Sequence, residues 1–126
     1  MRYFCDRSLG LKIPQALKER GVDVIIHDKM YVHDTEDTVW LAEAGRQGWT
    51  VLTKDDRIRF RRSEKQALMT HNVGCFVLMR RNDKTPQLIA ALDLAWSRIE
   101  QISASEQRPF LYGIYADGAM QKRKLS

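Results

Sequence analysis

Short apolar and β-branched runs alternate with helix-forming segments along the whole chain, and this alternation constrains the fold more than any other feature. Each run has the length and residue types of a β-strand. Alternation of strands with helices favours a mostly parallel sheet that has helices on both faces. The sequence therefore predicts an α/β fold with a sheet of four to five strands. The predicted strands cover residues 2–5, 22–26, 50–53, 74–79 and 110–115.

Helix signals mark the segments between these strands. Pro14 near a helix start and Gly21 just past its end bracket the first helix. Ser63 and Gln66 form a capping box for a later helix, whereas residues 27–34 are predicted to form a polar loop. The predicted helices cover residues 13–20, 34–47, 63–72 and a long segment that begins at residue 85.

Length and composition indicate one ordinary domain. The chain has 126 residues, and we expect residues 1–118 to form a single domain and the basic residues 119–126 to form a mobile tail. No apolar run approaches the roughly 20 residues that span a membrane, and the polar N-terminus shows no secretory signal. Cys5 and Cys75 lie within apolar runs, which favours buried free thiols and a cytoplasmic protein.

Acidic residues from distant segments are predicted to meet at one edge of the sheet. Asp6 follows the first strand, Asp55 and Asp56 follow the third, and Asp37 lies at the start of the helix after the second. Ligands of open α/β sheets bind outside the carboxyl ends of the strands. The clustered carboxylates would repel one another, and a hard divalent cation such as Mg²⁺ or Mn²⁺ would relieve that repulsion. Such an ion can polarise a phosphodiester and activate water for attack on it.

Each acid also has a purely structural interpretation. Asp6 could cap a loop or pair with Arg7. Asp37 could belong to a helix-capping arrangement with Asp34, and either acid after the third strand could cap the segment that follows. What favours a functional site is that all of these acids fall at the same edge.

A basic segment follows the acids. The chain carries 21 Lys and Arg against 16 Asp and Glu, a net charge of +5, which is compatible with a polyanionic partner. Cations beside a metal site suit a phosphate backbone that is held while it is cut, although they could equally form a solvated surface. The predicted RNA-binding residues are Arg57, Arg59, Arg61 and Arg62.

Two stretches together resemble the PIN-like nuclease domains. They are FCDRSLGLKIPQALKERGVDV and DTEDTVWLAEAGRQGWTVLTKDD. The nearest likeness is to VapC-type toxins, whose pattern has an Asp near the N-terminus, an acidic helix and a T-x-D after a strand. The resemblance spans roughly residues 2–79. It implies a three-layer α/β/α fold and Mg²⁺- or Mn²⁺-dependent cleavage of RNA.

The resemblance also implies roles for individual residues. Asp6, Asp37 and Asp55 correspond to the metal-binding acids, and Thr53 to the hydroxyl that orients the acidic loop. Asp56 is the candidate for a fourth catalytic acid, and Glu36 for an extra one.

The predicted function is therefore a metal-dependent endoribonuclease, the toxin of a type II toxin-antitoxin pair. Its expected partners are an RNA substrate, a cognate antitoxin and a second copy of the chain, with no membrane. Two alternatives remain open: a receiver-like phosphoacceptor domain, and a non-catalytic RNA-binding or assembly domain with a degenerate acidic site.

Overall fold

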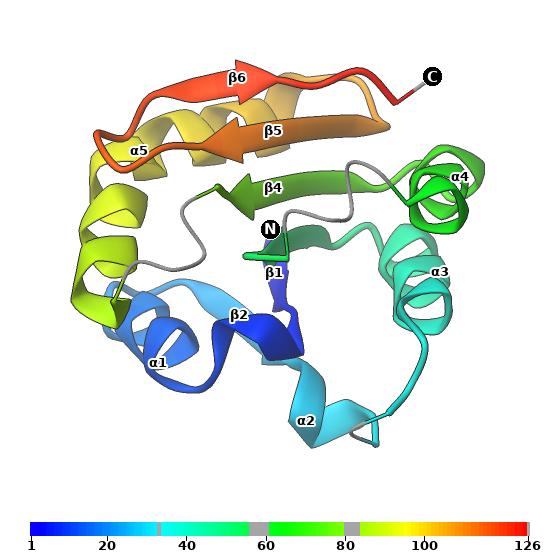
Figure 1. The fold of residues 1–126 in the computed structure, drawn as a ribbon, viewed down its shortest axis with the longest axis horizontal. Helices are drawn as coiled ribbons and strands as arrows, with labels where there is room; N and C mark the ends of the chain where they lie inside the picture. The colour runs from blue at the N-terminus through cyan, green and yellow to red at the C-terminus, as the bar shows by residue number, and fades with distance from the viewer. Residues whose placement is uncertain (33, 56–60, 80–83, 126) are drawn as a thin grey trace.

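A six-stranded sheet with the order β2-β1-β3-β4-β5-β6 forms the centre of the molecule (Figure 1). The computed structural model describes residues 1–32, 34–55, 61–79 and 84–125. All neighbouring strands pair in parallel except β5 and β6, which are antiparallel. The strands are β1 (Arg2–Cys5), β2 (Asp23–Ile26), β3 (Thr50–Thr53), β4 (Gly74–Leu78), β5 (Phe110–Ile114) and β6 (Met120–Lys122).

Helices cover both faces of this sheet, which confirms the predicted three-layer α/β/α fold. Helices α1 and α5 pack on one face, and α3 and α4 pack on the other (Figure 1). A short 3₁₀ turn, η1 (Arg7–Leu9), directly follows β1. The α-helices are α1 (Lys12–Glu19), α2 (His27–Met30), α3 (Asp37–Gln47), α4 (Arg62–Thr70) and α5 (Thr85–Ser105).

The core is divided into two layers because side chains alternate across each strand. Tyr3 and Cys5 of β1 point toward α1 and α5, whereas Phe4 points toward α3 and α4. The Phe4 ring stacks on Trp40 with the ring centroids 5.0 Å apart, and on Trp49 with the centroids 5.8 Å apart. This aromatic stack fixes α3 against the middle of the sheet.

The strand order places a topological switch point between β1 and β3. The chain leaves β1 for β2 on one side, and then crosses to β3 on the other side of β1. Crossovers that leave a parallel sheet in opposite directions open a crevice at the carboxyl ends of the two strands, and ligands bind there. Asp6 and the segment after Thr53 follow these two strands directly, so the fold brings them to this crevice.

The C-terminal segment differs from the prediction. Met120–Lys122 adds β6 to the edge of the sheet, so the sheet has one strand more than expected, and these residues are not a tail outside the fold. Side-chain and backbone contacts hold the strand in place. Lys122 pairs with Glu106 at 3.1 Å, and the Arg123 N–H donates to the carbonyl of Leu111 at 2.7 Å.

Three local helix predictions also need correction. The predicted loop at 27–34 contains a one-turn helix, α2. Helix α3 begins at Asp37, because Thr35 closes its own turn by donating its hydroxyl to the carbonyl of Val32 at 2.8 Å. Helix α4 begins at Arg62, so Ser63 lies inside its first turn and is not the cap of a capping box.

Both cysteines are buried free thiols, as predicted. Burial raises the pKa of Cys5 to about 12 and also raises the pKa of Cys75, so neither has the character of a nucleophile. Within the described parts of the chain, no helix combines the length and the apolar character that crossing a membrane requires.

Candidate active site

Asp6 is a buried carboxylate at the switch point, with 7% of its surface exposed. Its backbone N–H donates to the carbonyl of Leu52 at 2.9 Å, which continues the pairing of β1 with β3 one residue past the strand. Two hydroxyls donate to the same carboxylate oxygen, Oδ2: Thr53 at 2.7 Å and Ser8 at 2.8 Å. The carboxylate is therefore held in one orientation.

The same two hydroxyls organise the loop that follows β3. The Thr53 hydroxyl accepts the N–H of Asp55 at 3.0 Å, and the Ser8 hydroxyl accepts the N–H of Lys54 at 3.2 Å. The two hydroxyl oxygens lie 3.1 Å apart. Thr53 thus links the orientation of the Asp6 carboxylate to the position of the Asp55 backbone.

The surroundings of Asp6 favour a nearby cation. Burial raises the pKa of its carboxyl group, and the charge of Asp37 raises it further. The hydrogen bonds from Thr53, from Ser8 and from the Arg7 backbone act in the opposite direction. A carboxylate that is oriented yet electrostatically destabilised gains from a positive ion more than an exposed one does.

Asp37 connects Asp6 to a second buried acid. It lies in the first turn of α3, where the helix dipole favours a negative charge, and its Oδ1 accepts the indole N–H of Trp40 at 3.2 Å. Asp37 and Glu64 of α4 line the same pocket, and the proximity of Asp37 raises the pKa of Glu64. Asp37 therefore interacts electrostatically both with Asp6, which follows β1, and with Glu64 of α4.

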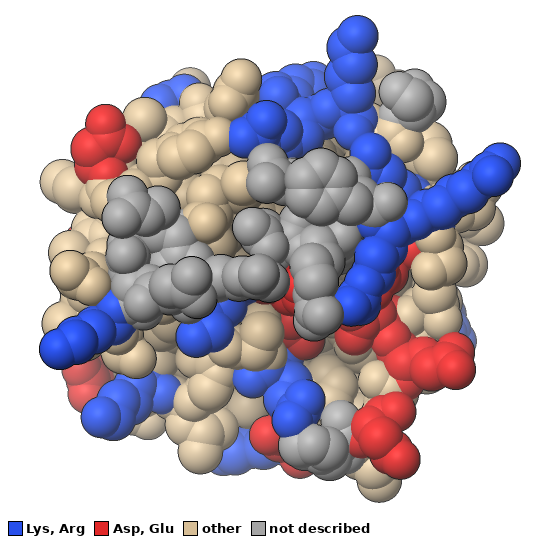
Figure 2. Space-filling view, viewed as in Figure 1, with Lys and Arg blue, Asp and Glu red and all other residues tan. Residues whose placement is uncertain are grey.

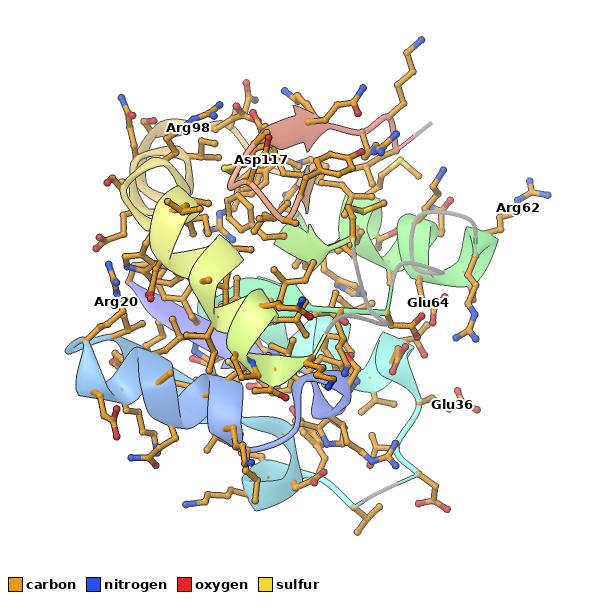
Figure 3. The ribbon with its side chains drawn as sticks, turned by 60° about the vertical axis from the view of Figure 1, so that its left-hand side comes forward. Arg20, Glu36, Arg62, Glu64, Arg98 and Asp117 are labelled. Carbon is orange, nitrogen blue, oxygen red and sulfur yellow. The ribbon has the colours of Figure 1, made fainter. Side chains whose placement is uncertain are left out.

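Glu64 is only 5% exposed. Burial and, after it, the proximity of Asp37 raise the pKa of Glu64 to about 7. The guanidinium of Arg61, whose Nη1 lies 3.1 Å from Oε1, opposes this shift. Figure 3 shows Glu64 between α4 and the start of α3, whereas Arg62 points away from this region.

A pocket of about 440 Å³ opens where α3 and α4 begin. Acidic side chains gather on this part of the surface, with lysine and arginine side chains directly beside them (Figure 2). The residues that line the pocket all have polar or charged side chains: Thr35, Glu36, Asp37, Thr38, Arg61, Ser63 and Glu64.

Comparison with known families identifies the fold family. The model of the family described as PIN like domain matches residues 1–80, which is more than half of the chain. The chain belongs to the PIN-like domain family. No curated protein and no solved structure matches it. The candidate acids of this PIN-like domain all lie within the matched residues, and the match does not extend to α5, β5 and β6.

The predicted site residues of the PIN-like domain are only partly brought together. Asp6, Thr53 and the Asp55 backbone are joined by hydrogen bonds, and Asp37 acts on Asp6 through its charge. Glu36 precedes α3 and lines the pocket. Arg61 contacts Glu64, and Arg62 is exposed. The remaining predictions lie outside the described residues: Asp56, Arg57 and Arg59.

The donor set fits a hard divalent cation, because every candidate ligand is an oxygen atom. Among the described residues, no three acidic, histidine or cysteine side chains are grouped closely enough to hold a metal ion by themselves. This is compatible with Mg²⁺, which commonly takes one or two carboxylates and completes its coordination with water and substrate phosphate.

Sequence reasoning missed Ser8 and Glu64. Ser8 lies two residues after Asp6, within reach of a local side-chain contact. Glu64 is spaced three and four residues before Ala67 and Leu68, both buried, which places it on the buried face of α4. That spacing was the available signal, since an acid on a buried helix face requires a partner.

Proposed function

We propose that this PIN-like domain is a metal-dependent endoribonuclease. The observation that carries the proposal is the buried Asp6 carboxylate, oriented by two hydroxyls beside Asp37 at the switch point of the sheet. An acid held in this way is costly to bury without a cation, and the crevice is where α/β sheets bind ligands.

The residues have separate roles in this proposal. Asp6, Asp37 and Asp55 would hold Mg²⁺ or Mn²⁺, with coordinated water bridging the carboxylates that do not reach the ion directly, and Asp56 would be the further acid. Bound there, the ion would supply charge stabilisation at the phosphodiester and lower the pKa of a coordinated water. Thr53 holds the Asp6 carboxylate and the Asp55 backbone in a fixed relative position. The site would then be ordered before the substrate binds.

Cations beside the acids would bind the flanking phosphates of the RNA. Arg62 is exposed at the start of α4, and Arg57 and Arg59 precede it in the chain. Arg61 is held by Glu64, so its contribution to RNA binding is the least of the four. Phosphate contacts of this kind predict that binding weakens as the salt concentration rises.

RNA cleavage assays with site variants test the proposal. Purified protein should cleave a structured RNA in the presence of Mn²⁺ or Mg²⁺, and EDTA should stop the reaction. Asp6→Asn and Asp55→Asn should abolish cleavage and keep the native circular dichroism spectrum. Asp93→Asn is the matched control, because Asp93 is exposed on α5 and, among the residues that the structure describes, pairs only with Arg20. Full cleavage by both site variants would refute the assignment.

We further propose that the chain is the toxin of a toxin-antitoxin pair, in the cytoplasm. The motif likeness to VapC-type toxins supports this, and it implies an antitoxin that covers the acidic crevice and a homodimer as the assembly. Expression alone should arrest bacterial growth, and co-expression of a cognate antitoxin should relieve the arrest. Arrest that persists in the Asp6→Asn variant would contradict a nuclease toxin.

The two alternatives predict different results in the same assays. A receiver-like domain shares the strand order of this sheet, but the family match supports the PIN-like interpretation. Stable phosphorylation of an aspartate by a small phosphodonor would favour the receiver. RNA binding without any cleavage or specific Mn²⁺ binding would favour the non-catalytic domain.

A further inference from the structure

A basic groove of about 490 Å³ lies where the end of α4 meets the segment after β6. Its apolar side chains include Met69 of α4 and Leu125, which also packs against the core layer under α3 and α4. Three cations line it as well: Lys122, Arg123 and Lys124. None of the described residues that line the groove is acidic, so it favours a ligand that combines negative charge with apolar surface.

The cations of the basic groove are only partly used within the fold. Lys122 pairs with Glu106 at 3.1 Å, and the guanidinium of Arg123 donates to the hydroxyl of Tyr115. Lys124 is exposed and forms no ion pair with any residue that the structure describes. A lysine without an acidic partner, next to two other cations, keeps its charge available for a polyanion.

Helix α4 connects the basic groove to the candidate active site. Arg62, Lys65 and Met69 are spaced three and four residues apart, so they lie on one face of the helix. Arg62 lies at the end of α4 beside the acidic pocket, and Met69 lies about 10 Å further along the helix, at the groove. Lysine and arginine side chains extend over this side of the molecule, next to the acidic side chains (Figure 2).

This arrangement suits a single strand of RNA. Proteins bind single strands with a positively charged groove that follows the phosphates and with side chains that contact the unpaired bases. The volume of the basic groove falls within the range of small-ligand sites, about 300–1,000 Å³, and one nucleotide fits such a site. An acidic protein segment would also match the charge, but the row of cations leads to the candidate acids, which favours the substrate of that site.

We propose that Lys65, Arg123 and Lys124 bind the single-stranded flank of the RNA substrate, and that Met69 and Leu125 contact one of its bases. The segment after β6 lies outside the residues that the family model matches, so membership of the PIN-like domain family does not imply this surface. The inference rests on the proposed function because it takes RNA as the substrate, but binding can be measured without cleavage.

Fluorescence anisotropy in EDTA with a labelled single strand of about 12 nucleotides measures the affinity. The double variant Lys65→Gln/Lys124→Gln should bind at least about tenfold more weakly at low salt, because it loses two phosphate contacts. For the same reason, the slope of log affinity against log salt should become about 1.4 less steep. The control is Lys12→Gln/Lys18→Gln, which removes the same charge from exposed positions on α1, across the sheet. It should bind as the native chain does.

The Leu125→Ser variant tests the contact with a base. It should weaken binding by about threefold at every salt concentration and leave the salt slope unchanged, because the lost contact carries no charge. Its melting temperature shows whether the segment after β6 stays folded. Unchanged affinity would refute the base contact.

The outcomes separate this surface from the proposed nuclease. If Lys65→Gln/Lys124→Gln bound RNA as tightly as the native chain, the proposal would be wrong, and an acidic protein would be the ligand that fits the basic groove. Equal losses in the two double variants would indicate general attraction by net charge and would also overturn it. Native binding that depends on Lys65 and Lys124 without any cleavage in Mn²⁺ would refute the nuclease and leave this proposal standing.

Discussion

At the scale of single residues, the candidate site depends on which atoms share a hydrogen bond with Asp6. Thr53 and Ser8 both donate to the same oxygen, Oδ2. Each hydroxyl also accepts a backbone N–H from the loop after β3. A hydroxyl can donate once and accept twice. Both side chains can therefore orient the Asp6 carboxylate and the backbone of the following loop at the same time.

Replacing Thr53 with valine tests this arrangement. The variant keeps the shape of the side chain but leaves Asp6 and the Asp55 N–H each without one partner. We expect a loss of about 1.5–3 kcal/mol in the free energy of unfolding, because the lost bond joins a hydroxyl to a buried carboxylate. Urea denaturation measures it. Thr53→Ser keeps the hydroxyl and should therefore retain most of the stability of the native chain. If Thr53→Val were as stable as Thr53→Ser, the assigned role of the hydroxyl would be wrong.

The raised pKa of Glu64 predicts a pH dependence of stability. Its value rises from 4.5 to about 7 in the folded protein, so the folded chain holds this proton more tightly than the unfolded chain. The free energy of unfolding of the metal-free protein should therefore fall as pH rises between about 4.5 and about 7, and the contribution should level off above that range.

Urea denaturation in EDTA at several pH values measures this fall. Glu64→Gln cannot lose the proton, so its stability should decline less over the same range. Glu19→Gln, at an exposed position on α1, is the control and should follow the native chain. Parallel curves for the native chain and Glu64→Gln would show that Glu64 titrates normally.

Some site residues were readable from the sequence and others were not. Asp6, Asp37 and Asp55 follow from the carboxyl-edge rule, since that rule needs only the ends of strands and the starts of helices. The contact of Ser8 with Thr53 and that of Glu64 with Asp37 depend on which side chains meet across elements, although the sequence places Ser8 near Asp6 and Glu64 on the buried face of its helix. No single-chain pattern reports that α4 brings its first turn to the first turn of α3.

At the scale of elements, the spacing of α3 and α4 decides whether Asp37 meets Glu64. Gly45 lies in the last part of α3, and a Cβ at this position would overlap the carbonyl oxygen and Cβ of His71, just after α4. Glycine inside a helix ordinarily costs about 1 kcal/mol relative to alanine. Its presence here is explained by the close approach of the two helices.

The Gly45→Ala substitution should push these helices apart. Because the overlap involves backbone atoms of the partner segment, no rotamer change can relieve it. We expect a net loss of about 1–3 kcal/mol in the free energy of unfolding and weaker Mn²⁺ binding, since the carboxyl groups at the other end of the helices separate. Thermal denaturation and Mn²⁺ titration measure the two effects.

Gln47→Ala provides the matched comparison on α3. Gln47 is exposed and bonds only to Glu43 in the described parts of the chain, so its loss should change stability by less than about 0.5 kcal/mol. If alanine at position 45 were tolerated equally well, the close approach would not be a constraint.

The sequence patterns predict some element boundaries correctly and others not. Strands β1 and β3 begin and end as predicted, because each is a short apolar run bounded by polar residues. Helix α2 was missed because its four residues, three of them polar, are too few to show a helical period. Burial of His27 against Phe4 and Trp40 accompanies that turn. Likewise, Ser63 and Gln66 have the residue types and spacing of a capping box, but helix α4 begins one residue earlier, at Arg62.

At the scale of the whole molecule, the last strand closes one edge of the sheet. Lysine and arginine side chains made residues 119–126 look like a solvated tail. Pairing with β5 satisfies the backbone of β6, while Arg123 contacts the hydroxyl of Tyr115 and Lys122 contacts Glu106. Basic side chains on an edge strand also discourage further pairing with other chains.

Deletion of residues 119–126 should lower the melting temperature by at least about 5 °C, because β5 becomes an open edge. The folded fraction should still bind Mn²⁺, since none of these residues is one of the candidate acids. Lys122→Gln is the control, and it should cost less than about 1 kcal/mol because the Lys122 side chain of the ion pair is largely exposed. An unchanged melting temperature on deletion would mean that β6 adds nothing to the fold.

The division of the core between two faces has a practical consequence. Every described acid of the site precedes Met79, while α5 and β5 contribute the large apolar side chains Leu92, Trp96 and Phe110 to the opposite layer. A chain cut between Met79 and Lys84 would therefore give two fragments. The first would contain all the candidate acids, and the second would contain the α5 and β5 side chains that fill one layer of the core. Each fragment could be fused to one half of an inducible dimerisation pair. Adding the inducer would then bring the fragments together and switch on the activity of the domain.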